Sequence, residues 1–286
     1  MTVTLDPTDH ANSAEGALEV GRCLLDDLRS FLCRFVAFPE PEQADAVTLW
    51  IAHTWAFEAA EATPRLSIQS AEKQSGKTRL LELLDLLVRS SLSVASISAA
   101  AMFRLIADGP TTLLIDEADT IFDGRGSGAE DLRGVLNAGY RRGGGVMRAA
   151  GKGTGVQRFS VFAPVALAGI GRLPDTVQDR SIVIRLKRRG ITESVEKLRR
   201  REVEPDALAL RTVVSGWAEE NIPVLAAPSS SDSRRARRSR RRHLGTAPRD
   251  RSPRWRWLAR ACRRSRDLTV SSSGRRRRKR RSSSPR

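Results

Sequence analysis

The segment at residues 71–78, AEKQSGKT, constrains the fold of this 286-residue chain more than any other feature. It follows residues 65–70, a short run that is typical of a strand, and opens residues 77–89, a leucine-rich run that is typical of a helix. Further strand-like and helix-like runs alternate up to residue 190. This alternation predicts an α/β fold with a mainly parallel sheet that is covered by helices on both faces.

The spacing of apolar residues sets the expected elements. The expected strands are residues 65–70, 92–97, 112–116, 159–168 and 181–186. The expected helices are residues 16–38, 42–62, 77–89, 98–107 and 129–140, a short one within 173–180, and further helix over 191–226.

The segment at residues 71–78 matches the P-loop pattern, in which backbone N–H groups at a helix N-terminus surround phosphate oxygens. Gly76, Lys77 and Thr78 fit the pattern, whereas Ala71 replaces its first glycine. We expect Ser75 and Gly76 to approach the phosphates, Lys77 to pair with the β/γ-phosphates, and the Thr78 hydroxyl to ligate Mg²⁺. Taken alone, Gly-Lys-Thr fits an ordinary turn into a helix equally well.

A second motif, TLLIDE at residues 112–117, ends an apolar strand in two carboxylates about forty residues after the loop. We expect Asp116 to hold Mg²⁺, directly or through water, and Glu117 to polarise the attacking water. An acidic strand end that caps the next turn is the alternative. The two motifs in this order favour a Mg²⁺-dependent ATPase, and the Glu after the Asp is typical of the P-loop division that contains AAA+ and RecA-like ATPases.

Three residues further along the chain are weaker candidates. Arg180 ends the short helix expected before the last strand, where oligomeric ATPases commonly carry an arginine that reaches the neighbouring subunit's γ-phosphate. Arg172 is the second choice for this role, and a surface ion pair between Arg180 and a nearby aspartate is the alternative. Asn137 could orient a water, and a helix C-terminal cap is equally compatible with its position.

Other residues have competing explanations as well. A glycine-rich segment carries five cations that could touch a nucleic-acid backbone, although a solvated loop is favoured; they are Arg141, Arg142, Arg148, Lys152 and Arg158. His53 lies among apolar helical residues, so packing is favoured over ligand binding. The same holds for Trp50 and Trp55, which we expect in the core rather than stacked on bases.

The formal net charge of +17 is unevenly distributed. Residues 1–226 carry 27 basic and 30 acidic side chains, a balance of −3, whereas residues 227–286 carry 23 basic and 3 acidic, a balance of +20. This excludes a protein that is basic over its whole length. We divide the chain into a disordered leader (1–15), an N-terminal helical segment (16–64), a P-loop core (65–190), a short, truncated helical lid (191–226) and a disordered Arg/Ser-rich tail (227–286).

The remaining composition points to a cytoplasmic protein without a membrane association. No run approaches the ~18 apolar residues of a membrane span. Residues 1–15 are polar and carry neither the basic start nor the apolar run of a secretory signal. The three scattered cysteines, Cys23, Cys33 and Cys262, indicate neither a disulfide framework nor a zinc site.

Four segments, taken in order, resemble a family of P-loop domains of unknown function from actinobacteria and their phages. They read TPRLSIQSAEKQSGKTRLLELL, TLLIDEADTIF, LNAGYRRGGGVMR and FSVFAPVALAGIGRLPDTVQDRSIVIRLKRR. The resemblance covers residues 24–226 and implies an AAA+/helicase-like ATPase core, in a family often found beside replication modules of mobile elements. It carries over to Gly76, Lys77, Thr78, Asp116 and Glu117, and the family also tends to lack the first glycine.

The tail departs from this family, which continues with a segment similar to DIWEPLLAI. Codons for that segment, read one base earlier, can encode Arg-His-Leu-Gly-Thr-Ala-Pro-Arg-Asp, the sequence of residues 242–250. We therefore expect the reading frame to shift between residues 226 and 241, which the coding DNA would decide. The alternative is a disordered DNA- or RNA-binding arm, in which arginines neutralise phosphates and Trp255 and Trp257 stack on bases.

Together these observations predict a P-loop ATPase that binds ATP and Mg²⁺, acts on or near DNA in a phage or mobile element, and forms a homo-oligomer. Lys77, Glu117 and a neighbour's Arg180 would be its catalytic residues. Two alternatives remain open. The chain could bind ATP as a switch or be an inactive relic, or it could bind nucleic acid through its tail alone.

Overall fold

The computed structural model describes residues 7–72, 74–122, 127–149, 155–190 and 193–227, all within a compact unit that spans Met1–Pro228. A second unit, Ser229–Arg286, lies outside the described residues. The expectation of a disordered or frameshifted tail therefore stays a prediction, and so do the roles proposed for its arginines and tryptophans.

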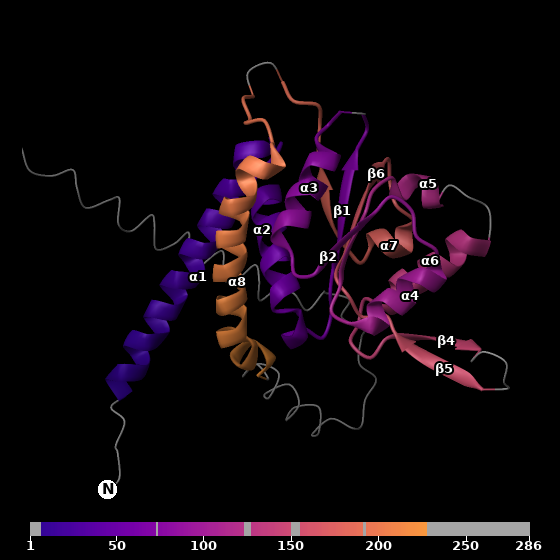
Figure 1. Cartoon of the computed structure of the whole chain (residues 1–286), viewed down its shortest axis with the longest axis horizontal. Helices are drawn as coiled ribbons and strands as arrows, with labels where there is room; N and C mark the ends of the chain where they lie inside the picture. The colour runs from indigo at the N-terminus through magenta and orange to yellow at the C-terminus, as the bar shows by residue number, and fades with distance from the viewer. Residues whose placement is uncertain (1–6, 73, 123–126, 150–154, 191–192, 228–286) are drawn as a thin grey trace, which may run out of the picture. The chain divides into compact units, whose positions relative to one another are not determined.

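Five parallel strands form the central sheet, in the order β2-β3-β6-β1-β7 (Figure 1). Their bounds are β1 Arg65–Ser70, β2 Ser91–Val94, β3 Thr112–Ile115, β6 Val165–Ile170 and β7 Ser181–Arg185. All six residues of β1 are buried, because β6 and β7 pair with it on either side and helices cover both faces. The predicted α/β class with a parallel, helix-covered sheet is confirmed.

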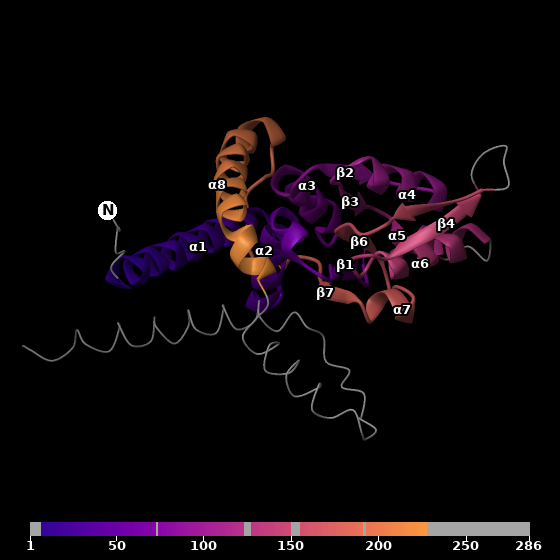
Figure 2. The same ribbon diagram turned by 90° about the horizontal axis from the view of Figure 1, so that it is seen from below.

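Helices pack on both faces of the sheet, and the alternation of side chains along β3 shows the division. Leu114 belongs to one buried cluster, whereas Leu113 and Ile115 belong to the other. Helices on the Leu114 side are α1 Pro7–Phe35, α2 Pro41–Trp55, α3 Lys77–Leu87 and α8 Arg200–Ala226. Helices on the opposite side are α4 Ala99–Asp108, α5 Ala118–Phe122, α6 Ser127–Ala138 and α7 Asp175–Gln178 (Figure 2).

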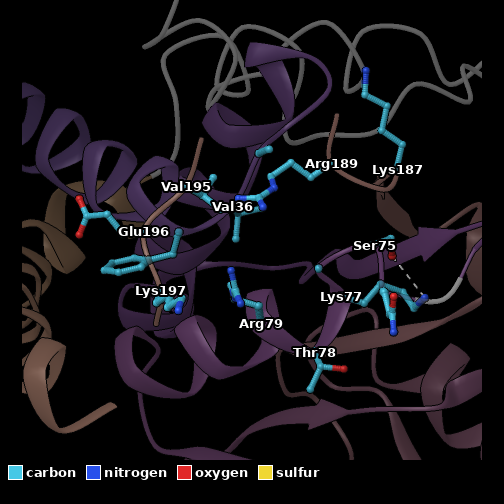
Figure 3. A pocket seen from close by; sticks show the side chains of 14 residues that line it. Val36, Ser75, Lys77, Thr78, Arg79, Lys187, Arg189, Val195, Glu196 and Lys197 are labelled. Carbon is cyan, nitrogen blue, oxygen red and sulfur yellow. Dashed lines mark hydrogen bonds between the residues drawn. The ribbon is translucent and has the colours of Figure 1, made fainter. Parts of the chain in front are cut away.

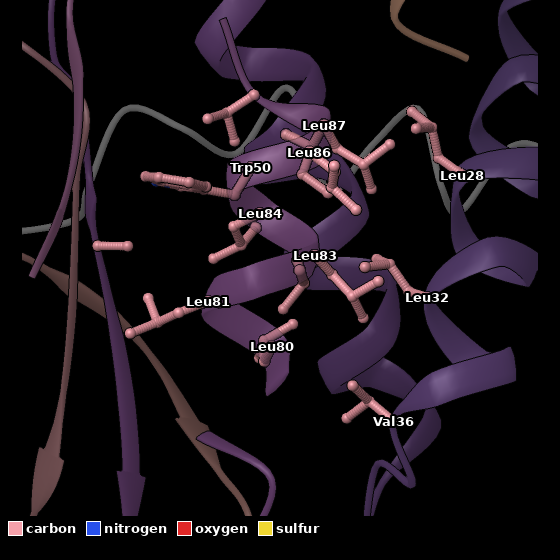
Figure 4. Close-up of a cluster of buried hydrophobic side chains, with 14 of the residues drawn as sticks. Leu28, Leu32, Val36, Trp50, Leu80, Leu81, Leu83, Leu84, Leu86 and Leu87 are labelled. Atoms are coloured by element: carbon pink, nitrogen blue, oxygen red, sulfur yellow. The ribbon is translucent and has the colours of Figure 1, made fainter. Parts of the chain in front are cut away.

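Helix α3 buries a broad stripe of leucines, whereas Thr78 and Glu82 on its remaining face are exposed. Its buried residues are Leu80, Leu81, Leu83, Leu84, Leu86 and Leu87. Leu28 and Leu32 of α1 and Trp50 of α2 lie in the same cluster (Figure 4). Helix α8 packs on α1, α2 and α3, so the first and last helices form an outer layer over α3.

The residues expected to form one strand at 159–168 form parts of two strands in different sheets. β5 (Val156–Ser160) pairs antiparallel with β4 (Gly145–Ala149), and β6 begins only at Val165. Pro164 explains the break, because proline has no N–H to donate to a ladder and its own carbonyl accepts from Leu113. The antiparallel β4–β5 pair is an additional element that the sequence analysis did not assign as strands.

Three helix boundaries also differ from the expectation. α1 begins at Pro7, so residues 7–15 are helical rather than part of a disordered leader; proline is favoured at a first helical position. α2 ends at Trp55 and is followed by a 3-10 turn, η1 (Phe57–Ala59), instead of continuing to residue 62. Of the described residues 193–226, the helical ones are those of α8, which begins at Arg200 and contains Pro205 and Pro223.

Candidate functional site

The carboxyl ends of β1, β3 and β6 lie side by side, because the three strands are parallel and neighbours in the order β3-β6-β1. In open α/β sheets, ligands bind at this edge. The segments at residues 71–78 and 116–117 follow β1 and β3 directly, so the fold brings the two predicted motifs to the same edge.

Residues 71–78, which we call the phosphate loop after the predicted motif, lead from β1 into the N-terminus of α3. Gly76 is the N-cap residue with a φ of 91°, and no side chain caps the helix. Gln74 also has a positive φ of 60°, whereas Ala71 does not, which explains why alanine fits where the pattern has glycine. The uncapped first turn of α3 leaves N–H groups that suit an anion.

Lys77 directs its ammonium group back onto the loop. Nζ donates to Ser70 Oγ, to the Glu72 carbonyl at 3.3 Å and to Ser75 Oγ at 3.5 Å. Ser70 Oγ in turn donates to the Glu72 carbonyl at 2.7 Å. The ammonium therefore rests on neutral oxygens, without a carboxylate to compete with an incoming phosphate.

Thr78 and Asp116 meet across the two motifs. Thr78 Oγ1 donates to Asp116 Oδ2 at 3.3 Å, and Asp116 Oδ1 accepts from the Glu117 N–H at 2.9 Å. Glu117 is exposed and has a φ of 52°, which is uncommon for a residue with a side chain. Hydroxyl and carboxylate oxygens thus lie together beside an exposed second carboxylate.

The end of β6 is fixed between the two motifs. The Gly171 N–H donates to the Ser70 carbonyl at 3.2 Å, and the Ile170 N–H donates to Asp119 Oδ1 at 3.0 Å. A Cβ on Gly169 would lie 2.6 Å from Asp119 Oδ1, so this close approach requires glycine. Sequence reasoning missed Asp119 and Gly169, although a glycine near the end of an apolar strand was a possible signal. Arg172, which follows directly, is exposed near this edge.

Arg180 lies at the opposite, amino edge of the sheet. Its carbonyl accepts from the Arg65 N–H at 2.9 Å, and the next residue, Ser181, is in register with Arg65 at the start of β1. A six-residue strand separates the two edges by about 20 Å. The structure therefore does not bring Arg180 to the phosphate loop of its own chain. Its guanidinium donates to the Thr176 carbonyl, and the expected ion pair with an aspartate is not found among the described residues.

Asn137 also lies at the amino edge and not at the phosphate loop. Its Nδ2 donates to Thr176 Oγ1 at 3.2 Å. The preceding residue, Leu136, offers its carbonyl to the guanidinium of Arg65, the first residue of β1. The expectation that Asn137 orients a water in this site is therefore wrong for the site of its own chain.

The arginines of the β4–β5 segment mainly hold the chain together. Arg142 donates to the carbonyls of Phe57, Glu58 and Ala60, and Arg158 to that of Gly143. Arg148 lies 3.6 Å from an Asp131 carboxylate oxygen and stacks on Phe103. Lys152 lies outside the described residues. The described contacts of Arg142, Arg148 and Arg158 are thus with their own chain, and a contact with nucleic acid stays a prediction.

Arg65 is a buried cation that sequence reasoning missed. It is only 1% exposed, and Nη1 and Nη2 donate to the Ala163 and Leu136 carbonyls, each at 2.6 Å. Its Nε has no partner in the described part of the chain, and burial lowers the pKa of the guanidinium to about 9. The Leu136 carbonyl belongs to the last turn of α6, where a cation is favourable.

The predictions for His53, Trp50 and Trp55 are confirmed as packing. His53 is buried, its Nε2 lies 2.9 Å from Thr63 Oγ1, and desolvation lowers the pKa of the imidazole to about 4. Both indole N–H groups donate to carbonyls, Trp50 to Pro64 and Trp55 to Leu87.

A cavity of about 540 Å³ adjoins the phosphate loop (Figure 3). Its walls come from the end of α1 and the residues after it, from the loop and first turn of α3, and from the segment that follows β7. Phe35, Val36, Ala37 and Val195 form an apolar part of the wall. The volume is within the range of small-molecule sites.

No family model matches the chain, and no curated protein matches it. In the portion that the structure describes, no group of three or more His, Cys, Asp or Glu residues could hold a metal ion by itself. Nor does any helix of that portion have the length and apolarity to cross a membrane.

Proposed function

We propose that the chain is a Mg²⁺-dependent P-loop ATPase. The observation that carries the proposal is the 3.3 Å contact between Thr78 Oγ1 and Asp116 Oδ2, beside the ammonium of Lys77 at the N-terminus of α3. Nucleotide hydrolysis needs backbone N–H groups around the phosphates, a cationic side chain and oxygen ligands for a metal ion, all close together. The order of the strands also supports the proposal, since only β6 separates β1 from β3 and the two motifs follow these strands at one edge of the sheet.

The residues present fit a Mg²⁺ ion. Mg²⁺ prefers oxygen ligands and is usually bound by one or two protein groups together with water and substrate phosphates. The Thr78 hydroxyl and the Asp116 carboxylate supply such oxygens, and their mutual hydrogen bond holds both at one place. When bound, the ion would neutralise charge on the phosphates.

The remaining chemistry belongs to the chain itself. An arriving triphosphate offers Lys77 stronger, anionic acceptors than the Ser70 hydroxyl and the Glu72 carbonyl. Glu117 accepts the proton of the attacking water as its oxygen bonds to the γ-phosphorus, and the bond to the β-γ bridging oxygen breaks to give ADP and phosphate. The nucleoside would extend into the cavity toward Val36 and Val195.

The proposal extends to context and assembly. The resemblance of the four segments points to a helicase-like or DNA-associated role in a phage or mobile element, located in the cytoplasm. Arg180, at the amino edge, reaches a phosphate only in the site of a neighbouring copy, which makes a homo-oligomer part of the proposal.

Lys77→Ala and Glu117→Gln test the proposal on the full chain. We expect Lys77→Ala to weaken ATP binding about 100-fold by calorimetry, because a charge-assisted contact worth about 2–3 kcal/mol is lost. Glu117→Gln should still bind ATP, and its turnover, measured as phosphate release, should be about 10²–10⁴-fold lower than that of wild type. Arg188→Ala, which removes a cation outside the cavity wall, is the control.

The outcomes separate the alternatives. Equal ATP affinity of wild type and Lys77→Ala would contradict the P-loop assignment. Tight binding by wild type with no turnover, with or without single-stranded DNA, would identify a switch rather than an ATPase.

A further inference from the structure

The cavity beside the phosphate loop is more cationic than a neutral nucleoside requires. Five of its lining residues carry a positive charge: Lys77, Arg79, Lys187, Arg189 and Lys197. Glu196 is the one acidic residue that lines it. Like charges around one cavity repel each other unless an anion neutralises them.

The single carboxylate does not neutralise this charge. Glu196 Oε2 lies 3.1 Å from Arg34 Nη2, on the last turn of α1, and the Glu196 N–H donates to the Arg34 carbonyl at 2.7 Å. Lys187 lies 3.9 Å from Glu193. In the described part of the chain, Arg79 and Arg189 have neither an ion pair nor a side-chain hydrogen bond, so both guanidinium groups are available to a ligand.

The two arginines reach the cavity from different elements. Arg79 follows Thr78 in the first turn of α3, and Arg189 lies in the segment after β7. Lys187 and Arg189 line the cavity but Arg188 does not. Figure 3 shows the Arg79 and Arg189 side chains directed toward Val36, whereas Lys187 points away. The pair thus lies on the nucleoside side of the cavity, beyond the loop.

We propose that Arg79 and Arg189 form a second phosphate-binding pair, separate from the phosphate loop. Two guanidinium groups on facing walls suit a phosphate, whose oxygens accept their charge-assisted hydrogen bonds. The inference rests on the proposed nucleotide ligand and specifies it further. That second phosphate is either the α-phosphate of the triphosphate or a phosphate on the ribose ring.

The test uses calorimetry on the full chain with AMP and with adenosine 3′,5′-bisphosphate. Arg79→Gln and Arg189→Gln remove one charge each from the pair, and Arg188→Gln removes the same charge one residue outside the cavity. We expect each pair variant to lose about tenfold in affinity for at least one ligand, and the control less than twofold. Thermal melting of each variant verifies that it is folded.

The two ligands distinguish the sources of the phosphate. If the ribose phosphate is bound, wild type prefers the bisphosphate about tenfold over AMP, and Arg189→Gln abolishes this preference. If the α-phosphate is bound, Arg189→Gln weakens both ligands alike. Losses no larger than those of Arg188→Gln, or no binding of either ligand by wild type, overturn the inference.

AMP has no β- or γ-phosphate, so its binding should not need the Lys77 ammonium. Repeating the measurement in a Lys77→Ala background therefore separates the two proposals. If Lys77→Ala weakens ATP binding as expected while Arg79→Gln and Arg189→Gln leave the affinities for AMP and the bisphosphate unchanged, only the second phosphate site is refuted. Unchanged ATP affinity in Lys77→Ala refutes the P-loop function alone.

Discussion

The two edges of the sheet hold their charged side chains in different ways. At the carboxyl edge, Lys77 donates to Ser70 Oγ and Thr78 donates to Asp116 Oδ2, and Lys77, Thr78 and Asp116 remain at least partly accessible. At the amino edge, the guanidinium groups of Arg65 and Arg180 donate to backbone carbonyls. The role of a charged residue here therefore depends on the edge at which its strand places it, more than on the local motif around it.

The largest expected effect is on turnover and concerns Arg180 at the amino edge. We expect Arg180→Ala to lower ATP turnover about 10³-fold or more while ATP binding is retained, because the arginine would act on a neighbour's phosphates. Mixing Arg180→Ala with Lys77→Ala should restore part of the activity, since a mixed assembly contains intact sites. Phosphate release is the measurement.

Arg172→Ala is the matched control, because Arg172 lies at the carboxyl edge of its own chain. If Arg172 serves its own site, mixing Arg172→Ala with Lys77→Ala restores nothing. A full loss in Arg180→Ala without recovery on mixing would mean that Arg180 supports only the structure of its own chain.

A second prediction concerns the stability contributed by the amino edge. Arg65→Met should lower the free energy of unfolding by about 3 kcal/mol, because the Leu136 and Ala163 carbonyls both lose their buried donor. Urea denaturation measures the change. Lys77→Ala, at the accessible edge, should shift stability by less than about 1 kcal/mol. Equal effects of the two variants would contradict the contrast between the edges.

The smallest effect is a pH dependence of stability from His53, which contacts Thr63 just before β1. Its pKa is lowered from 6.5 to about 4 in the folded state, so the unfolded state binds the proton first as pH falls. The contribution of neutral His53 is full above pH 6.5 and is lost toward pH 4, about 2 kcal/mol by pH 5. His53→Gln should flatten this part of the curve in urea titrations at several pH values.

Local patterns were sufficient to predict the carboxyl edge and insufficient for the amino edge. The loop that carries Gly76 and Lys77 follows β1, and Asp116 follows β3, so a parallel sheet had to bring them to one edge. The position of Arg180 depends on the register of β7 against β1, and the burial of Arg65 depends on where α6 ends. Neither is encoded within a few residues. The contact of Asp119 with the end of β6 is non-local in the same way.

The burial of the six leucines of α3 has a practical consequence for anyone who wishes to shorten the protein. An excised fragment of residues 65–190 would contain both motifs, yet it would leave leucines such as Leu83 and Leu87 without their cover from α1, α2 and α8. We expect such a fragment to aggregate on expression. The boundaries at residues 64 and 190 therefore do not delimit a unit that folds alone. We expect the smallest fragment that can be produced to include the helices at both ends.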